Sequence, residues 1–224
     1  ITQFDGYEKK IANEVNEIYP LYMSRKGINP FVDIITLFDL FIKLTYIKPD
    51  YLLLFTIKPV IYGSIVARIN NIPHIVMITG LGTTFILRNW ITNVVKSLYR
   101  FSLKKASVVF FQNTDDKELF TSNNLVDSKV CKLTPGSGIE LDKFKFYNLP
   151  NEHNMTFLFI ARMLRDKWVI EFVEAARLCK CTRPEVEFLL VGDIDPTNPA
   201  SLSQKDLEDL RKHNNIELLG HSED

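Results

Sequence analysis

The chain has 224 residues, and its 27 Lys and Arg balance its 27 Asp and Glu, so the formal net charge is zero. This length allows one large domain or two small ones, and 46% hydrophobic with 24% charged residues is an ordinary globular composition. The balanced charge gives no indication of a nucleic-acid partner.

The composition also gives no indication of a membrane span, a disulfide framework or a metal site. The longest apolar candidate, residues 31–47, is interrupted by Asp33, Asp39 and Lys43, and no signal peptide opens the chain. Three cysteines are too few and too irregularly spaced for disulfide pairs or a zinc site. We therefore expect a cytosolic protein without a bound metal, whose thiols are buried or incidental.

Strand-like and helix-like segments alternate along the chain. The expected strands are short apolar runs at residues 18–22, 51–56, 74–79, 107–111, 129–133, 156–161, 187–191 and 216–219. The expected helices, with apolar residues at helical spacing, are residues 7–15, 31–47, 59–69, 88–104, 115–121, 168–180 and 204–213. Strands separated by helices predict βαβ units, and therefore an α/β fold with parallel sheets.

One interval interrupts this alternation. The segment from Thr134 to Asn151 contains several Gly, Pro and Asn residues and has no clear periodicity. We therefore expect two α/β domains, at residues 1–135 and 155–224, joined by a linker at residues 136–154.

The charges are distributed unevenly. Residues 51–114 contain seven Lys and Arg and no Asp or Glu, which favours an anionic partner such as a phosphorylated substrate or a membrane surface. The cations of one expected helix and its end are Arg88, Lys96, Arg100, Lys104 and Lys105. This helix is a candidate for contact with an anionic membrane or a lipid diphosphate. The alternative is an ordinary helix whose apolar face packs on the sheet.

Two cations follow the strand expected at residues 156–161. Arg162 and Lys167 lie between this strand and the next amphipathic helix. The carboxyl ends of strands form the ligand-binding edge of open α/β sheets, and a helix N-terminus favours anions. Cations at this position oppose the helix dipole unless an anion lies between them. The pattern predicts an anionic ligand, and the alternative is a solvated turn with two surface charges.

Other strands end in similar turns. Glycines in such turns allow a ligand to approach the backbone closely, although turns use glycine for other reasons too. The spacing is not G-x-G-x-x-G, so a nicotinamide dinucleotide fingerprint is absent. The residues concerned are Lys58, Thr79, Gly80 and Gly82 in the first expected domain, and Gly192, Gly220 and His221 in the second.

A set of segments resembles a known family. In chain order they are "TIKPVIYG", "ITGLGTTF", "VVFFQNTDDKELF", "LTPGSGIELDKF", "FLFIARMLRDK", "EFVEAARL", "LLVGDIDPTNP" and "LGHSED". Together they resemble bacterial family 4 glycosyltransferases of the GT-B fold. Within this family they look most like enzymes of capsule, exopolysaccharide and lipid-linked oligosaccharide assembly. The resemblance covers nearly the whole chain.

The resemblance implies a fold and an activity. The fold would be two Rossmann-like domains whose parallel sheets face a cleft. The first domain would take a polyprenyl-diphosphate-linked or saccharide acceptor, and the second a nucleotide-sugar, usually a UDP-sugar. Transfer in this family retains the anomeric configuration, commonly without metal, and no separate cofactor is implied. Such an enzyme would work in the cytoplasm, at the inner face of the plasma membrane.

The resemblance also implies roles for individual residues, although it assigns no catalytic residue. Arg162 and Lys167 match the Arg and Lys that hold the donor diphosphate. The residues near the nucleotide would be Gly192, Gly220 and His221, and those of the acceptor side Lys58, Thr79, Gly80 and Gly82.

The chain departs from the family pattern at three points. The family's first strand with its glycine-rich loop and its E-x7-E glutamate motif are both absent. The chain therefore resembles a fragment trimmed at both ends, with incomplete sheets, and the expected activity is that of the parent protein. Trp168 stands where the family usually has glycine, and it could narrow the phosphate loop or pack outward.

Two other functions stay open. A non-catalytic GT-B homologue or scaffold would keep the cleft without turnover, although the presence of both Arg162 and Lys167 argues against it. A sugar-nucleotide epimerase of similar fold would need an acid/base pair in the cleft, and the sequence shows no convincing one.

Overall fold

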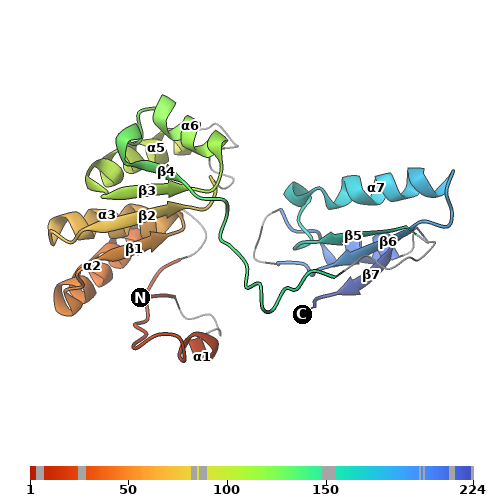
Figure 1. Ribbon diagram of the computed structural model, residues 1–224, viewed down its shortest axis with the longest axis horizontal. Coiled ribbons are helices and arrows are strands. Elements are labelled where there is room, and N and C mark those ends of the chain that lie inside the picture. Colours follow the sequence, from red (N-terminus) through yellow and green to blue (C-terminus); the bar gives the residue numbers. More distant parts are fainter. Residues whose placement is uncertain are drawn as a thin grey trace. The chain divides into compact units, whose positions relative to one another are not determined.

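The computed structural model describes residues 1–3, 8–24, 29–81, 85, 90–147, 155–196, 198, 200–211 and 215–222. The chain divides into two compact units, unit 1 (Ile1–Phe144) and unit 2 (Lys145–Asp224), which are described separately (Figure 1). The division falls inside the interval 136–154, and the assignment of that whole interval as a linker stays a prediction.

Unit 1 contains a parallel four-stranded sheet in the order β1–β2–β3–β4 (Figure 1). The strands are β1 (Leu52–Phe55), β2 (His74–Ile78), β3 (Val108–Phe111) and β4 (Cys131–Leu133). Because all four run in the same direction, their carboxyl ends meet at one side of the sheet, here called the carboxyl edge.

Two helices, α1 (Glu8–Ile11) and α2 (Pro30–Ile47), precede β1. The strands are connected by α3 (Ile57–Ile69), α5 (Trp90–Ser102) and α6 (Thr114–Ser122), with 3-10 turns η1 (Leu103–Lys105) and η2 (Ser128–Val130). Helix α3 packs on β1 and β2 and contacts α2 and α5, and α6 packs on β3 and β4. Asn113 caps α6, since its side-chain oxygen accepts the Asp116 N–H at 2.7 Å.

The burial of the strands alternates. Leu54 of β1 and Val76 of β2 are buried in the core, whereas Leu53 and Phe55 remain 60% and 50% exposed. Successive strand residues point to opposite faces, so one face of β1 packs against helices and the other is open among the described residues.

Unit 2 contains a parallel three-stranded sheet in the order β5–β6–β7 (Figure 1). Its elements are β5 (Thr156–Ile160), η3 (Arg165–Lys167), α7 (Val169–Lys180), β6 (Glu187–Val191), α8 (Gln204–Arg211) and β7 (Glu217–Gly220). The Phe172 ring of α7 packs against the rings of Phe159 and Phe188, at centroid distances of 5.2 and 5.7 Å. This contact holds α7 on β5 and β6.

The α/β class with parallel sheets is confirmed, and most expected elements occur with small shifts at their ends. The strand expected at residues 18–22 is wrong, because this segment has only an isolated bridge between Pro20 and Thr2. Both bonds of this bridge, to the Tyr19 carbonyl and from the Leu21 N–H, involve Thr2, and a single bridged residue does not make a ladder. The helix expected at residues 7–15 is shorter, since α1 buries no residue and a short helix without packing is marginal.

Candidate functional site: the carboxyl edges of the two sheets

The expected donor residues lie at the carboxyl edge of unit 2. Arg162 follows β5, Gly192 follows β6 and Gly220 ends β7. The Ala161 N–H donates to the Val191 carbonyl at 3.1 Å, and the Gly192 N–H donates to the Gly220 carbonyl at 2.7 Å. These backbone bonds bring the three strand ends together.

Gly192 is required by the packing of this edge. Its φ is +141°, and a Cβ atom there would lie 1.8 Å from the Ala161 carbonyl oxygen. We expected the turn glycines to leave room for a ligand, but on this side of Gly192 the Ala161 backbone fills the space. Gly220 has φ +76°, and a Cβ atom there would meet nothing within 4 Å. Gly192 is therefore constrained by contact as well as conformation, and Gly220 by conformation alone.

Arg162 is oriented and accessible at the same time. Its Nη1 lies 2.9 Å from Asp195 Oδ2, and its side chain is 59% exposed. The Asp195 backbone N–H donates to the Ser201 hydroxyl at 3.0 Å, which positions the partner of the guanidinium. Arginine has five N–H donors, so the bond to Asp195 leaves donors for phosphate oxygens.

Lys167 lies in η3, one residue before the turn into α7. Its backbone N–H donates to the Leu164 carbonyl at 3.0 Å, and Arg165 Nη2 lies 3.3 Å from Asp206 Oδ2 of α8. Hydrogen bonds from Ser203 and then the nearby Arg165 lower the pKa of Asp206 below its usual range. This turn is therefore tied to α8.

Trp168 separates η3 from α7, and the helix begins one residue later than expected. Its φ of 65° and ψ of 27° lie in the left-handed region, so α7 begins at Val169. The side chain is 69% exposed, which favours outward packing over narrowing of the phosphate loop. His221, which follows β7, is also exposed.

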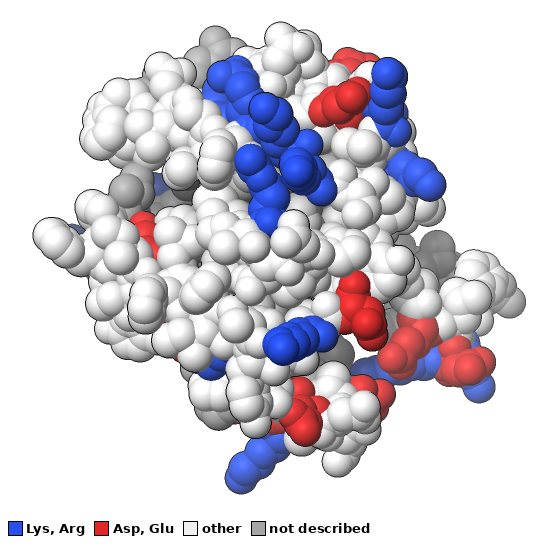
Figure 2. Space-filling model, turned by 90° about the vertical axis from the view of Figure 1, so that its left-hand side faces the viewer, with Lys and Arg blue, Asp and Glu red and all other residues white. Residues whose placement is uncertain are grey.

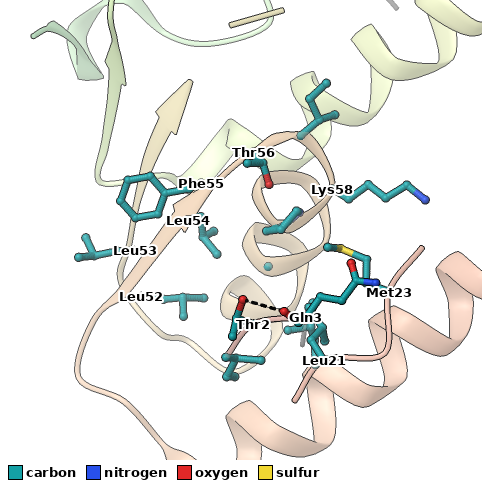
Figure 3. Close-up of a pocket in the computed structure, with 15 residues that line it drawn as sticks. Thr2, Gln3, Leu21, Met23, Leu52, Leu53, Leu54, Phe55, Thr56 and Lys58 are labelled. Atoms are coloured by element: carbon teal, nitrogen blue, oxygen red, sulfur yellow. Dashed lines mark hydrogen bonds between the residues drawn. The ribbon is translucent and has the colours of Figure 1, made fainter. Parts of the chain in front are cut away.

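Two cavities lie at β1 in unit 1. The larger, of about 660 Å³, lies between β1, the first turn of α3 and the segment Ile1–Gln3 (Figure 3). Figure 3 shows the side chains of Leu52 and Leu54 on one side of β1 and those of Leu53 and Phe55 on the other. The Lys58 side chain extends away from these leucines at the rim of the cavity.

The smaller cavity, of about 260 Å³, lies between the carboxyl ends of β1 and β2. Thr79 and Gly80 line it, together with Thr56 and Ile57, which also line the larger cavity. The structure thus places three of the expected acceptor-side residues at the rims of adjoining cavities. Gly82 lies outside the described residues.

Lys58 is bonded inside unit 1. Its Nζ lies 2.8 Å from Asp33 Oδ1 in the first turn of α2, and the two side chains are only 17% and 14% exposed. Burial, followed by the Asp33 carboxylate, raises the pKa of the adjacent Tyr62 phenol well above its usual value. The Lys58 charge is therefore compensated by Asp33.

Comparisons with known proteins show which family the chain resembles. Residues 8–113 match the family model described as glycosyl transferase 4-like. The chain is 29% identical over 216 residues to the N,N'-diacetylbacillosaminyl-diphospho-undecaprenol alpha-1,3-N-acetylgalactosaminyltransferase of Campylobacter jejuni, covering 89% of this chain and 56% of that protein. The resemblance to family 4 glycosyltransferases is confirmed.

Two further comparisons extend this result. The capsular polysaccharide biosynthesis glycosyltransferase CapM of Staphylococcus aureus is 23% identical over 239 residues, covering 100% of this chain and 61% of CapM. The crystal structure of Anabaena HepE in complex with UDP-glucose has a TM-score of 0.64 at 15% identity, covering 97% of this chain and 59% of HepE. The fold is GT-B. The chain spans little more than half the length of these family 4 relatives and of HepE.

Sequence reasoning missed two residues of unit 1 that lie near Lys58. Asp33 is 25 residues from Lys58 in the chain, and no spacing rule connects them. Thr56 follows β1 and precedes α3 with φ 66° and ψ 161°, a combination rare for any residue with a side chain and rarer for a β-branched one. The sequence "FTIKP" gave no signal of this strain, because such strain is imposed by surrounding packing.

The cations expected on α5 are partly engaged within unit 1. Arg100 donates to the carbonyls of Asn123 and Asn124, both at 3.0 Å, and Lys96 Nζ donates to Asn123 Oδ1 at 2.9 Å. These carbonyls lie just beyond the end of α6, where cations are favoured by the helix dipole. Arg88 lies outside the described residues.

In the described part of the chain, no group of three or more His, Cys, Asp or Glu is placed to hold a metal ion. None of the helices described there combines the length and the apolarity that crossing a bilayer requires.

Proposed function

We propose that the protein containing this chain transfers a sugar from a UDP-sugar to a polyprenyl-diphosphate-linked or saccharide acceptor, with retention of anomeric configuration, in bacterial surface polysaccharide assembly. The observation that carries the proposal is the oriented and exposed Arg162 guanidinium at the carboxyl edge of β5–β7. The named relatives support the same class, since one acts on a diphospho-undecaprenol and HepE was crystallised with UDP-glucose.

Arg162 and Lys167 would bind the donor diphosphate. As the sugar leaves, negative charge grows on the terminal phosphate of UDP, so fixed cations there stabilise the transition state more than the bound substrate. Asp195 keeps the guanidinium in place before the donor arrives, and the remaining N–H groups bond phosphate oxygens. The role of both cations is electrostatic, and neither serves as a general base.

The nucleoside would lie across the turns at Gly192, Gly220 and His221, which adjoin Arg162 at the same edge. The acceptor would bind at the rims of the two cavities in unit 1, beside Lys58, Thr79 and Gly80. Since Lys58 is compensated by Asp33, it contributes hydrogen bonds to an acceptor more than free charge. We infer that the protein works in the cytoplasm, in contact with the anionic inner face of the plasma membrane.

The test is transfer of labelled sugar from UDP-sugars to a lipid extract by the full-length protein. Arg162→Ala and Lys167→Ala should each lower the rate by about a hundredfold while leaving the fold intact. Arg177→Ala is the matched control, because Arg177 is a half-exposed cation of the same unit that pairs with Glu174 on α7. Near-normal transfer by either of the first two variants contradicts the diphosphate role.

The same assay separates the alternatives. A non-catalytic homologue binds UDP without any transfer. An epimerase converts the donor sugar without an acceptor, which NMR of the UDP-sugar pool detects. Retention is checked by the anomeric coupling constant of the transferred sugar in the product.

A further inference from the structure

Trp168 places a bulky side chain at a backbone position that suits glycine. Its φ of 65° and ψ of 27° lie in the left-handed region, which is unfavourable for a residue with a large side chain. The indole is 69% exposed, so packing does little to offset this strain. Among the described residues, no aromatic ring or cation stacks on it. The packing of the described part of unit 2 therefore gives no reason for a tryptophan at this position.

The segment after β6 holds the turn that carries Trp168. The Met163 N–H donates to the Asp193 carbonyl at 2.9 Å, and the Arg165 N–H donates to the Ala200 carbonyl at 2.8 Å. These bonds fix the backbone of the turn before any ligand binds. An aromatic side chain on an ordered turn loses little conformational entropy on binding, because it has only two side-chain torsions.

The side chains at both ends of this turn are buried. Met163, Leu164 and Val169 are at most 1% exposed, whereas residues 165–168 between them are all exposed. The buried residues anchor the turn to the core of unit 2. The turn thus presents three charged side chains and one indole to solvent, at the edge where Arg162 also lies.

Cations alone do not identify the ligand of a surface. Figure 2 shows a group of Lys and Arg side chains on a face of unit 1, and such a group attracts anions of many kinds. The turn after β5 differs, because the exposed Trp168 directly follows the exposed Lys167. A molecule that joins an anionic group to a ring with an apolar face matches this pair.

We propose that the Trp168 indole stacks on the sugar ring of the nucleotide-sugar and so helps to determine which sugar is accepted. This inference rests on the proposed function, in which Lys167 binds the donor diphosphate. The C–H groups on one face of a pyranose ring form an apolar surface, and an indole offers a flat face with negative electrostatic potential. An axial hydroxyl on that face of the sugar separates the two surfaces. Stacking therefore discriminates between sugars that differ at one carbon.

The connectivity of a nucleotide-sugar favours the sugar over the nucleobase as the partner of Trp168. The diphosphate joins the nucleoside at one end to the sugar at the other. Under the proposed function the nucleoside lies at the turns after β6 and β7, which carry Gly192 and Gly220. The turn after β5 then receives the terminal phosphate together with the sugar bonded to it. Trp168 adjoins the cation that binds this phosphate.

Calorimetric binding to the full-length protein tests the proposal. The probes are UDP, UDP-glucose, UDP-galactose and the N-acetylated forms of the two sugars. Trp168→Gly should weaken binding of the UDP-sugar that the parent prefers by about fivefold or more, and it should leave UDP binding unchanged. Trp168→Phe keeps a flat ring and should restore most of the affinity. Leu178→Ala is the matched control, because Leu178 is an apolar residue, 57% exposed, at the other end of α7.

Two further measurements separate recognition from folding. Trp168→Gly should unfold at the same temperature as the parent or a higher one, so weaker binding cannot be assigned to a damaged fold. In the transfer assay, its KM for the UDP-sugar should rise by a similar factor, whereas its KM for the acceptor should stay unchanged. Its preference between UDP-glucose and UDP-galactose, or between their N-acetylated forms, should also decrease.

Three results overturn the inference and leave the proposed function intact. Equal weakening of UDP and UDP-sugar binding by Trp168→Gly would assign the indole to the nucleotide. A higher KM for the acceptor with unchanged UDP-sugar affinity would assign it to the acceptor. Unchanged binding and kinetics would leave it without a ligand. Failure of the proposed function is distinguishable, because the parent would then bind no UDP or UDP-sugar, or Arg162→Ala would bind UDP as the parent does, and the inference would fall with it.

Discussion

Lys58 in unit 1 and Arg162 in unit 2 hold similar places in their sheets, yet they differ in what they can bind. Each follows a strand at the carboxyl edge, and each is bonded to an aspartate, at 2.8 and 2.9 Å. The Lys58–Asp33 pair is 17% and 14% exposed, whereas the Arg162 side chain is 59% exposed. One strand-end cation therefore serves the packing of its unit, and the other remains open to a ligand.

The glycines of the two edges differ in the opposite sense, because the glycine of unit 1 has open space beside it and that of unit 2 is packed against backbone. Gly80 after β2 and Gly192 after β6 have nearly equal φ values, +143° and +141°. A Cβ atom on Gly80 would meet nothing within 4 Å, while one on Gly192 would lie 1.8 Å from the Ala161 oxygen. At Gly80 the positive φ alone favours glycine. At Gly192 the positive φ and the contact with Ala161 both favour it.

The largest expected effect uses this glycine pair. Gly192→Ala should destabilise unit 2 by about 4 kcal/mol or more, because it combines backbone strain with a clash against backbone. Gly80→Ala should cost only about 1 to 2 kcal/mol, from strain alone. Denaturant unfolding of both variants measures the difference. Equal losses would contradict the steric role of Ala161.

The two aspartates give the next effect. Asp33→Asn leaves the Lys58 ammonium little exposed and without its carboxylate, so it should lower the free energy of unfolding by about 2 kcal/mol. Asp195→Asn should cost less than about 1 kcal/mol, because the Arg162 guanidinium can turn to water. Unfolding curves of the two variants and the parent decide this. A larger loss at Asp195 would reverse the comparison between the edges.

At Trp168 we expect a substitution that stabilises the protein. Trp168→Gly should raise the free energy of unfolding of unit 2 by up to about 1 kcal/mol, because glycine adopts φ 65° without strain and little packing is lost. The comparison is Asn71→Gly in unit 1, at φ 57°, which should gain less because asparagine tolerates this region. Thermal unfolding of each variant gives the shifts, and destabilisation by Trp168→Gly would show that the indole packs after all.

The smallest effect is a pH dependence in unit 1. Burial lowers the pKa of His74 from 6.5, so the folded state resists a proton that the unfolded state accepts. The free energy of unfolding should therefore fall by less than about 1 kcal/mol as the pH decreases from about 7.5 to about 5.5. His74→Leu should reduce that slope, whereas His221→Gln, at an exposed position in unit 2, should keep it. An unchanged slope in His74→Leu assigns the dependence to other groups.

The alternation of strands and helices was readable from the sequence because its signals are local. Periodicity in runs such as residues 156–161 and residues 168–180 depends on neighbouring side chains, and it predicted elements that the structure contains. The position of Arg162 at the carboxyl edge followed from the same signals, since parallel strands share one carboxyl edge. The failure at residues 18–22 shows the limit, because an apolar run needs a hydrogen-bonding neighbour to become a strand.

The sequence by itself determined the parallel α/β architecture and the edge on which Arg162 and Gly192 stand. Only the tertiary structure decided that Lys58 is held by Asp33, and that Thr56 is strained at the end of β1. It also decided which side of α2 stays in solvent. That helix is apolar nearly all round, so its pattern cannot select the buried side. The selection is made by packing against α3, and contacts between segments distant in the chain leave no periodic signal.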